Sequence, residues 1–415
     1  MIIDGRNYGG VCSCGKVHEY ETEFCIIEKG CLARADEYIS KHGFSGFCVA
    51  VYDENTYKAT EGLHPQADKE IILNPENLHA NEHGVELAMK EIPAGCDYLI
   101  AVGSGTVHDI TRYCAYLLKI PFVSCPTAAS VDGFCSSVAA MTWEGCKKTL
   151  IAVAPRIVIA DLDIISKAPM RLTRSGFGDM IGKYIALTDW KIGVILKGEH
   201  FCKVIYDMTL EATKAVVESA DGIANGDISA YEKLTYGLLL SGIAMKLLGN
   251  SRCASGAEHH ISHFIEMQPE GFGAISEALH GEKVGVGTLI ARREYERLAN
   301  AKNISFRDYP KIEDGYIKEM FGTLTDSIIA ENAKDSADGI TAELLYEKWD
   351  EICAVISSVP SYGELLECYN KIGACTTLSD IGIGEDKLSM LLEYSPLVRN
   401  RVTLMRLRRA IIEDN

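Results

Sequence analysis

The sequence lacks any long uninterrupted hydrophobic run and any cluster of basic residues. Its apolar stretches, such as LIAVAPRIVIA at 150–160, are too short and too interrupted to cross a bilayer, and the N-terminal MIIDGRNYGG contains no basic segment followed by an apolar one. Lysine and arginine number 41 against 58 aspartates and glutamates, a net charge of −17 that repels a nucleic-acid backbone. These absences predict a cytoplasmic protein with no membrane span and no nucleic-acid partner.

A dense cysteine framework is also missing. The 15 cysteines are scattered through apolar segments, as Cys48, Cys114 and Cys353 illustrate. Such cysteines behave as small hydrophobic residues, and their scatter differs from the close spacing of small disulfide-bonded secreted domains. The cysteines are therefore predicted to be mainly reduced, which again favours the cytoplasm.

One cysteine cluster has a different character. Cys12, Cys14 and His18 in CSCGKVH have residue types that bind zinc, but no second Cys-x-x-Cys or His-x-x-x-His half follows nearby. Cys25 and Cys31 are the next cysteines that could contribute. The alternative is an ordinary N-terminal strand, and the sequence leaves both interpretations open.

Strand-like and helix-like segments alternate in the first part of the chain. With 415 residues, 47% of them hydrophobic, the chain is long enough for two domains. Continuous β-branched runs predict buried strands, which are FCIIE (24–28), FCVAVY (47–52), EIILN (70–74), YLIAV (98–102), PFVSC (121–125) and RIVIA (156–160). Helical spacing occurs at 30–42, 80–92 and 106–119. The alternation predicts a parallel sheet with crossover helices, the general layout of a nucleotide-binding domain, and residues 134–151 are predicted to form a hairpin that extends this sheet.

After about residue 168 the pattern becomes helical. Predicted helices cover 176–197, 203–222, 229–248, 254–266, 284–301, 313–332, 341–357, 361–372, 385–394 and 398–412. We therefore predict an α/β nucleotide-binding domain at 1–168, followed by an all-α domain at 169–415.

A glycine-containing loop follows the strand at 98–102. In YLIAVGSGTVHD (98–109), Gly103, Ser104, Gly105 and Thr106 lead directly into a predicted helix. Glycine lets backbone N–H groups approach a phosphate, and a helix N-terminus favours an anion. The loop is not a complete G-x-G-x-x-G motif, so spacing alone leaves a plain strand-to-helix turn as an equal alternative.

Two other strand ends carry polar residues. Asp53 follows the strand at 47–52, where an acidic residue can accept hydrogen bonds from a ribose or can simply cap a helix. The loop PTAASVDGFCSS (126–137) is rich in small hydroxyl residues and contains the lone carboxylate Asp132. Thr127, Ser130 and Ser136 are candidate nucleotide contacts, and a capped turn is the alternative.

Candidate metal ligands gather in the helical part. Asp179 follows two glycines near a helix start, and four of the 11 histidines lie between residues 259 and 280. His259 and His263 are four residues apart and so share one face of a helix, while His280 precedes a glycine-rich helix start at 284–288. One carboxylate with two imidazoles suits zinc, iron or nickel. Spacing alone does not decide whether His259 pairs with His263 or with His280.

Five motifs in this order resemble the sn-glycerol-1-phosphate dehydrogenase family, within the larger group of iron-containing alcohol dehydrogenases, glycerol dehydrogenase and 3-dehydroquinate synthase. They are GSGTVHDITRY (103–113), PTAASVDGF (126–134), SGFGDMIGKY (175–184), SGAEHHISH (255–263) and LHGEKVGVGT (279–288). The resemblance covers roughly residues 45–300. Ser104 and Thr106 stand in a loop that is often richer in glycine, and His108 stands where relatives usually have an apolar residue.

The resemblance implies a metal-dependent, NAD- or NADP-linked oxidoreductase that interconverts dihydroxyacetone phosphate and sn-glycerol 1-phosphate. It implies one divalent ion (Zn, Ni or Fe) held by Asp179, His259 and His280. It implies that His263 and Asp132 are catalytic, and that Asp132, Asp179 and His263 bind the substrate. The implied cofactor-binding residues are Asp53, Gly103, Ser104, Gly105, Thr106, Val107, Thr127, Ser130 and Ser136.

Several alternatives remain at this stage. Glycerol dehydrogenase would use the same ligands on an unphosphorylated polyol, a dehydroquinate synthase-type lyase would use its nicotinamide transiently, and a non-catalytic nucleotide-binding protein would show no turnover. Lys183 and Arg252 are candidates for pairing with a substrate phosphate or for a structural ion pair. A homo-oligomer is expected on general grounds for such an enzyme.

Overall fold

The computed structural model describes residues 1–143 and 146–413. These residues group into two units by their internal contacts. Unit 1 contains residues 1–180 and 214–250, and unit 2 contains residues 181–213 and 251–415. Each unit is a set of residues that contact one another. The predicted domains 1–168 and 169–415 remain a prediction.

Unit 1 contains a seven-stranded sheet. Its strands, in spatial order, are β1 (Ile2–Asp4), β4 (Phe24–Glu28), β11 (Ile157–Asp161), β8 (Phe122–Pro126), β7 (Tyr98–Gly103), β5 (Cys48–Asp53) and β6 (Lys69–Leu73). All neighbouring strands are parallel except β1, which pairs antiparallel with β4. The six strands predicted from continuous hydrophobic runs are confirmed within one or two residues.

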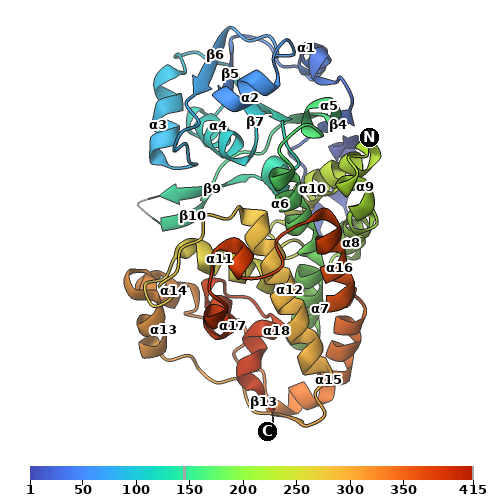
Figure 1. The fold of residues 1–415 in the computed structure, drawn as a ribbon, viewed down its shortest axis with the longest axis vertical. Coiled ribbons are helices and arrows are strands. Elements are labelled where there is room, and N and C mark those ends of the chain that lie inside the picture. The colour runs from blue at the N-terminus through green and yellow to red at the C-terminus, as the bar shows by residue number, and fades with distance from the viewer. Residues whose placement is uncertain (144–145, 414–415) are drawn as a thin grey trace. The chain divides into compact units, whose positions relative to one another are not determined.

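Both faces of this sheet are covered (Figure 1), which explains why its strands are hydrophobic at successive positions. Ala50 and Tyr52 of β5 pack in one core with α1 (Ala35–Lys41) and with residues from α2 (Glu54–Ala59) and α5 (Leu162–Ile165). Val49 and Val51 point to the opposite core, which contains α3 (Glu82–Glu91) and α4 (Gly105–Leu118). The predicted α/β arrangement is therefore confirmed.

The hairpin predicted at 134–151 forms, except that residues 144–145 lie outside the described part. Strand β9 (Val138–Trp143) pairs antiparallel with β10 (Cys146–Ile151), but the pair is a separate two-stranded sheet. The expectation that it extends the main sheet was wrong. Ala139 and Met141 pack into the same core as α4, so this hairpin covers a face of the sheet instead of adding strands to its edge.

The predicted run of helices follows. Unit 1 contains α6 (Met170–Ile181) up to residue 180, α9 (Ala220–Ala224) and α10 (Ile228–Leu248), and α8 (Lys203–Val217) is divided between the units. The helices of unit 2 are α7 (Lys183–Lys197), α11 (Ala257–Met267), α12 (His280–Ala299), α13 (Asp314–Phe321), α14 (Thr325–Glu331), α15 (Ala342–Ser357), α16 (Tyr362–Ile372), α17 (Leu388–Tyr394) and α18 (Leu404–Leu407). The helical character predicted after residue 168 is confirmed.

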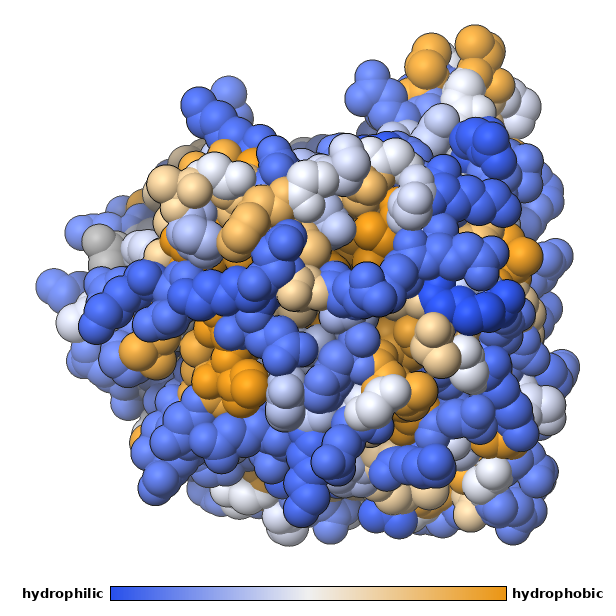
Figure 2. Space-filling model, turned by 90° about the horizontal axis from the view of Figure 1, so that it is seen from above, coloured by the Kyte–Doolittle hydropathy of each residue, from blue (hydrophilic) through white to orange (hydrophobic). Residues whose placement is uncertain are grey.

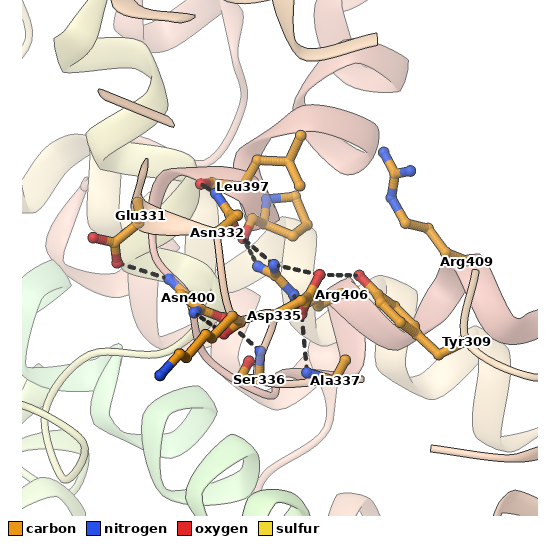
Figure 3. Close-up of polar contacts among 12 residues, drawn as sticks. Tyr309, Glu331, Asn332, Asp335, Ser336, Ala337, Leu397, Asn400, Arg406 and Arg409 are labelled. Atoms are coloured by element: carbon orange, nitrogen blue, oxygen red, sulfur yellow. Dashed lines mark hydrogen bonds and ion pairs between the residues drawn. The ribbon is translucent and has the colours of Figure 1, made fainter. Parts of the chain in front are cut away.

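The C-terminal segment is the main departure from the predicted helices. The helix predicted over 398–412 is reduced to α18, and the chain then forms β13 (Ile411–Glu413), which pairs with β12 (Ile304–Phe306). Fully buried Arg406 of α18 anchors this segment through its side chain (Figure 3). Its Nη1 donates to the carbonyl of Pro396 at 2.7 Å and its Nε to Asp335 at 2.9 Å. These hydrogen bonds connect α18 to Pro396 and to Asp335, which lies 71 residues earlier in the chain.

Hydrophilic residues cover most of the face seen in Figure 2, and hydrophobic residues appear there in several separate areas. None of the helices within residues 1–143 and 146–413 combines the length and apolar character that a membrane span requires.

Candidate functional site

The loop between β7 and α4 places the predicted phosphate-binding residues at a helix N-terminus. Ser104 is the N-cap of α4, and its Oγ lies 2.9 Å from Ser130 Oγ. A Cβ on Gly103 would lie 2.6 Å from the Cβ of Val107, so this turn requires glycine. The first backbone N–H groups of a helix have no partner within the helix and carry partial positive charge. The loop can therefore hold an anion.

His108 lies directly beneath this loop. Its Nδ1 is 3.0 Å from the Ser104 carbonyl oxygen and its Nε2 is 2.8 Å from Ser124 Oγ. A carbonyl only accepts, so Nδ1 carries the proton and Nε2 accepts from the serine hydroxyl. Burial lowers the pKa of His108 to about 3. His108 is thus a neutral residue that connects the loop to β8.

Asp53 ends β5, which lies next to β7 in the sheet. Its Oδ1 accepts a hydrogen bond from the Thr56 N–H at 2.8 Å, and Thr56 Oγ1 accepts from the Asp53 N–H at 3.1 Å. Asp53 therefore caps α2, which is one of the two roles that the sequence suggested for it. Parallel neighbours end at the same edge of a sheet, so Asp53 and the β7 loop share that edge.

The loop at 126–137 follows β8 at the same edge and packs against α6. The Thr127 N–H donates to the Gly103 carbonyl at 2.9 Å, and Ser175 Oγ donates to the Ser130 carbonyl at 3.1 Å. A Cβ on Gly176 would lie 2.1 Å from the Ala129 carbonyl oxygen. Only glycine permits this close approach of the helix to the loop.

Ser136 lies at the end of this loop, and its Oγ accepts a hydrogen bond from the Val138 N–H at 3.1 Å. The predicted cofactor residues Thr127, Ser130 and Ser136 therefore all have contacts within unit 1.

Asp132 and Asp179 are brought together within unit 1. The Asp132 N–H donates to Asp179 Oδ2 at 3.0 Å, and Ser241 Oγ donates to Asp132 Oδ2 at 2.9 Å. Asp179 is fully buried in the last turn of α6, so the expectation that it lies near a helix start was wrong, and Asp132 is 9% exposed. These bonds hold both carboxylates in place, so the two acidic residues predicted for the site are fixed by the same network.

Three of the predicted histidines meet in unit 2. The ring centroids of His259 and His280 are 5.4 Å apart, and His263 lies 5.9 Å from each of them. His259 and His263 come from α11, and His280 is the first residue of α12. His260 is fully buried and has no hydrogen-bond partner among the described residues.

Two glutamates, fully buried Glu258 and partly buried Glu266, orient this histidine cluster. Glu258 Oε1 lies 2.7 Å from His259 Nδ1, and Glu266 Oε1 lies 2.9 Å from His280 Nδ1. A carboxylate that accepts from Nδ1–H fixes the tautomer in which the lone pair lies on Nε2, and this arrangement surrounds many metal-bound imidazoles. Both imidazoles are therefore held in the tautomer that binds a metal through Nε2.

The sequence analysis did not identify Glu258 or Glu266. Glu266 lies three residues after His263 and seven after His259, a spacing that places all three on one face of α11 and could have pointed to it. His263, Glu266 and His280 also form a second group, in which one ligand atom from each lies within 4.8 Å of the others.

Electrostatic effects in the cluster are strong. Burial by itself raises the pKa of Glu266, but His280, His263 and Lys283 outweigh it, so the net pKa lies below its ordinary value. Desolvation lowers the pKa of His263, and neighbouring His259 and His280 add to that effect.

The start of α11 is set by Asp189 of α7. Its Oδ2 accepts from the Ala257 N–H at 2.9 Å, and its Oδ1 accepts from Tyr295 OH at 2.8 Å. Burial raises the pKa of Asp189 to about 7. A Cβ on Gly256 would lie 2.7 Å from Asp189 Oδ2, so glycine is needed where this carboxylate caps the histidine helix.

Comparison with known proteins identifies the family. The chain is 42% identical over 290 residues to glycerol-1-phosphate dehydrogenase [NAD(P)+] of Geobacillus thermodenitrificans (strain NG80-2), covering 68% of this chain and 72% of that protein. It is 31% identical over 416 residues to the protein of the same name from Halalkalibacterium halodurans, covering 98% and 97%. The chain belongs to the glycerol-1-phosphate dehydrogenase family. The resemblance predicted from the five motifs is confirmed.

Two further comparisons agree with this family. Residues 26–169 match the family model described as iron-containing alcohol dehydrogenase. The crystal structure of an iron-containing alcohol dehydrogenase from Corynebacterium glutamicum aligns with a TM-score of 0.62 at 15% identity, covering 93% of this chain and 91% of that one. At that identity the similarity concerns the fold alone. It confirms the fold predicted for a member of the glycerol-1-phosphate dehydrogenase family.

One candidate phosphate ligand has a structural role in this family member. Arg252 donates from Nε and Nη2 to Glu199 at 2.8 and 3.0 Å, and Nη2 also donates to the Val402 carbonyl at 2.6 Å. The structural alternative for Arg252 therefore has direct support, since its guanidinium connects three segments of unit 2.

Proposed function

We propose that this chain is a metal-dependent, NAD(P)-linked dehydrogenase that interconverts dihydroxyacetone phosphate and sn-glycerol 1-phosphate. The relatives named glycerol-1-phosphate dehydrogenase [NAD(P)+] support the activity, because one of them aligns over 98% of this chain. The single observation that carries the chemistry is the pairing of His259 and His280 with Glu258 and Glu266, which fixes both imidazoles in the tautomer with the lone pair on Nε2.

The proposed metal ligands are Asp179, His259 and His280. The donor set of one carboxylate oxygen and two imidazole nitrogens suits Zn, Ni or Fe, and three protein ligands leave positions for substrate oxygens. When bound, such an ion supplies positive charge that stabilises an alkoxide or polarises a carbonyl. Glu258 and Glu266 hold the imidazoles in one tautomer, and the Asp132 N–H holds the Asp179 carboxylate.

We assign the dinucleotide to the carboxyl edge of the sheet in unit 1. The backbone N–H groups at the start of α4 are suited to the pyrophosphate, and Asp53 at the neighbouring strand end is suited to a ribose hydroxyl. The proposed cofactor-binding residues are Asp53, Gly103, Ser104, Gly105, Thr106, Val107, Thr127, Ser130 and Ser136. The dinucleotide supplies the hydride acceptor or donor.

His263 and Asp132 are the proposed catalytic residues. His263 offers a ring nitrogen beside His259 and His280 and can bind a substrate oxygen or carry its proton. Asp132 is oriented by Ser241 and is joined through its backbone to Asp179. We propose that Asp132, Asp179 and His263 together contact the substrate.

The setting of the enzyme is also a proposal. Buried thiols such as Cys48 and Cys114 fit a reducing compartment, so we place the protein in the cytoplasm. We expect a homo-oligomer, which size-exclusion chromatography with light scattering would measure.

The test is the initial rate of NADH and NADPH oxidation with dihydroxyacetone phosphate, after chelation and re-addition of Zn, Fe(II) or Ni. We expect metal to restore the rate, the product to be sn-glycerol 1-phosphate, and His259→Ala to lose the restored rate. His260→Leu is the matched control, because this neighbouring histidine of α11 has no hydrogen-bond partner among the described residues.

Other outcomes would reject the proposal. Oxidation of glycerol without turnover of dihydroxyacetone phosphate would indicate a glycerol dehydrogenase. Binding of dinucleotide without turnover of either substrate would indicate a non-catalytic protein. If His259→Ala were as active as the unsubstituted protein, the proposed set of metal ligands would be wrong.

A further inference from the structure

The N-terminal hairpin of unit 1 contains a second group of metal-binding residue types. Strands β2 (Gly10–Val11) and β3 (Val17–His18) pair antiparallel, with Gly10 opposite His18. The Cys12 N–H donates to the Lys16 carbonyl at 2.9 Å and the Gly15 N–H to the Cys12 carbonyl at 3.0 Å. Gly15 has a φ of +84°, a conformation that favours glycine. This tight turn brings both cysteines close to His18.

His18 is oriented as a metal ligand. It is 5% exposed, and its Nδ1 lies 2.7 Å from the carbonyl oxygen of Leu247 in α10, which belongs to the same unit. Because a carbonyl only accepts, Nδ1 carries the proton and Nε2 keeps its lone pair. Nε2 lies 3.5 Å from Cys14 Sγ, and one ligand atom from each of Cys12, Cys14 and His18 lies within 4.8 Å of the others.

The distance from sulfur to nitrogen fits a shared ion. Bond lengths of about 2.3 Å for Zn–S and about 2.05 Å for Zn–N, at a tetrahedral angle, separate the two ligand atoms by about 3.6 Å. The observed separation is 3.5 Å.

We propose that Cys12, Cys14 and His18 bind a thiophilic divalent ion, with zinc as the best match. Two thiolates and one imidazole are soft ligands that select zinc over magnesium or calcium, and the two thiolate charges neutralise the ion. The fourth position belongs to water or to a donor outside the hairpin. The role of the ion is structural, since it joins the cysteines at the turn of the hairpin to His18 of β3, which contacts α10.

This site is independent of the proposed catalytic function, because it shares no residue with the ligand set Asp179, His259 and His280. A protein with both sites filled binds roughly two ions per chain. His259→Ala removes one ion and Cys14→Ser removes the other, so failure of one proposal is distinguishable from failure of the other.

The experiment uses the full-length chain, kept reduced and loaded with cobalt(II) as a spectroscopic probe. A thiolate-to-cobalt charge-transfer band in the near ultraviolet is expected in the unsubstituted protein and in His259→Ala. It should disappear in Cys12→Ser and Cys14→Ser. Cys353→Ser is the matched control, since this cysteine is also half-buried and should leave the band unchanged.

Zinc content measured by elemental analysis completes the test. Loss of roughly one equivalent in Cys14→Ser, with retention in Cys353→Ser, supports the site. If the cysteine variants fail to fold, release of zinc from the unsubstituted protein by a thiol-modifying reagent replaces them. The absence of a cobalt–thiolate band from the reduced protein would overturn the proposal, as would unchanged zinc content in folded Cys12→Ser and Cys14→Ser.

Discussion

Replacing Glu258 tests the link between this glutamate and the metal site. Glu258 is fully buried, and its Oε1 accepts from His259 Nδ1 at 2.7 Å and from the Gly256 N–H at 2.9 Å. Its Oε2 has no hydrogen-bond partner among the described residues. Glu258→Gln keeps an oxygen for His259 but removes the charge, and Glu258→Ala removes both. The two variants therefore separate tautomer control from electrostatic support of the imidazole.

Loss of a partner that orients a metal-bound histidine typically weakens metal binding about 10- to 100-fold. We expect Glu258→Gln to weaken metal binding about 10-fold, which is about 1.4 kcal/mol of binding free energy. Glu258→Ala should weaken it about 100-fold, which is about 2.7 kcal/mol. The rate at saturating metal should change much less than the affinity, because His259 itself remains. Competition with a chelator of known affinity measures the binding constant, and recovery of NADH oxidation against buffered free metal gives an independent value.

Glu294→Gln is the matched control. Glu294 is also a buried acid of unit 2, but it pairs with Arg297 at 2.8 Å and with Arg408 at 2.6 Å. Its replacement should lower the free energy of unfolding without changing metal affinity. A metal affinity for folded Glu258→Ala within twofold of the unsubstituted protein would refute the reasoning, since His259 would then need no carboxylate partner.

Three further predictions concern stability. The folded state keeps His108 neutral down to a pKa of about 3, whereas the unfolded chain binds a proton below about pH 6.5, so stability should fall as the pH drops through this window. The loss should reach about 2 kcal/mol at pH 5. Urea unfolding of His108→Gln should show a flatter dependence on pH, and an unchanged dependence would contradict the assignment. Asp335→Asn removes the charge opposite fully buried Arg406 and should cost about 3–5 kcal/mol in chemical unfolding. Asp207→Asn, at an exposed pair with Lys203, should have no measurable effect, and equal losses would reject this ranking. Gly176→Ala places a Cβ 2.1 Å from the Ala129 carbonyl oxygen and should cost about 1–3 kcal/mol. Gly315→Ala, whose Cβ would meet no atom within 4 Å, should not lower the melting temperature, and an equal fall in both variants would argue against the close contact.

Much of unit 1 was predictable from the sequence because its determinants are local. A strand buried on both faces is hydrophobic at successive positions, and this pattern identified β4, β5 and β7. Glycines after a strand marked the loop at Gly103, where the structure shows that a Cβ does not fit. Histidines four residues apart marked one face of α11.

Contacts between distant parts of the chain were decided only in the tertiary structure. Glu266 joins the histidine cluster because α12 brings His280 Nδ1 to 2.9 Å from its Oε1, and Asp189 caps α11 from a helix 68 residues earlier. The hairpin β9–β10 forms as predicted, but packing of Met141 decides that it covers the sheet. The spacing of residues indicates the periodicity of a single helix or strand. It does not indicate which other helix or strand packs against it.

The sequence by itself thus determined the succession of strands and helices, the glycine-containing turn after β7 and the set of histidines. The tertiary structure decided which carboxylate holds each histidine, where the C-terminal segment stops being helical and how the strands are ordered. The physical reason is that backbone propensity and hydrophobic periodicity act over a few residues. Hydrogen bonds such as Arg406 to Asp335 instead depend on packing that brings together residues far apart in the chain.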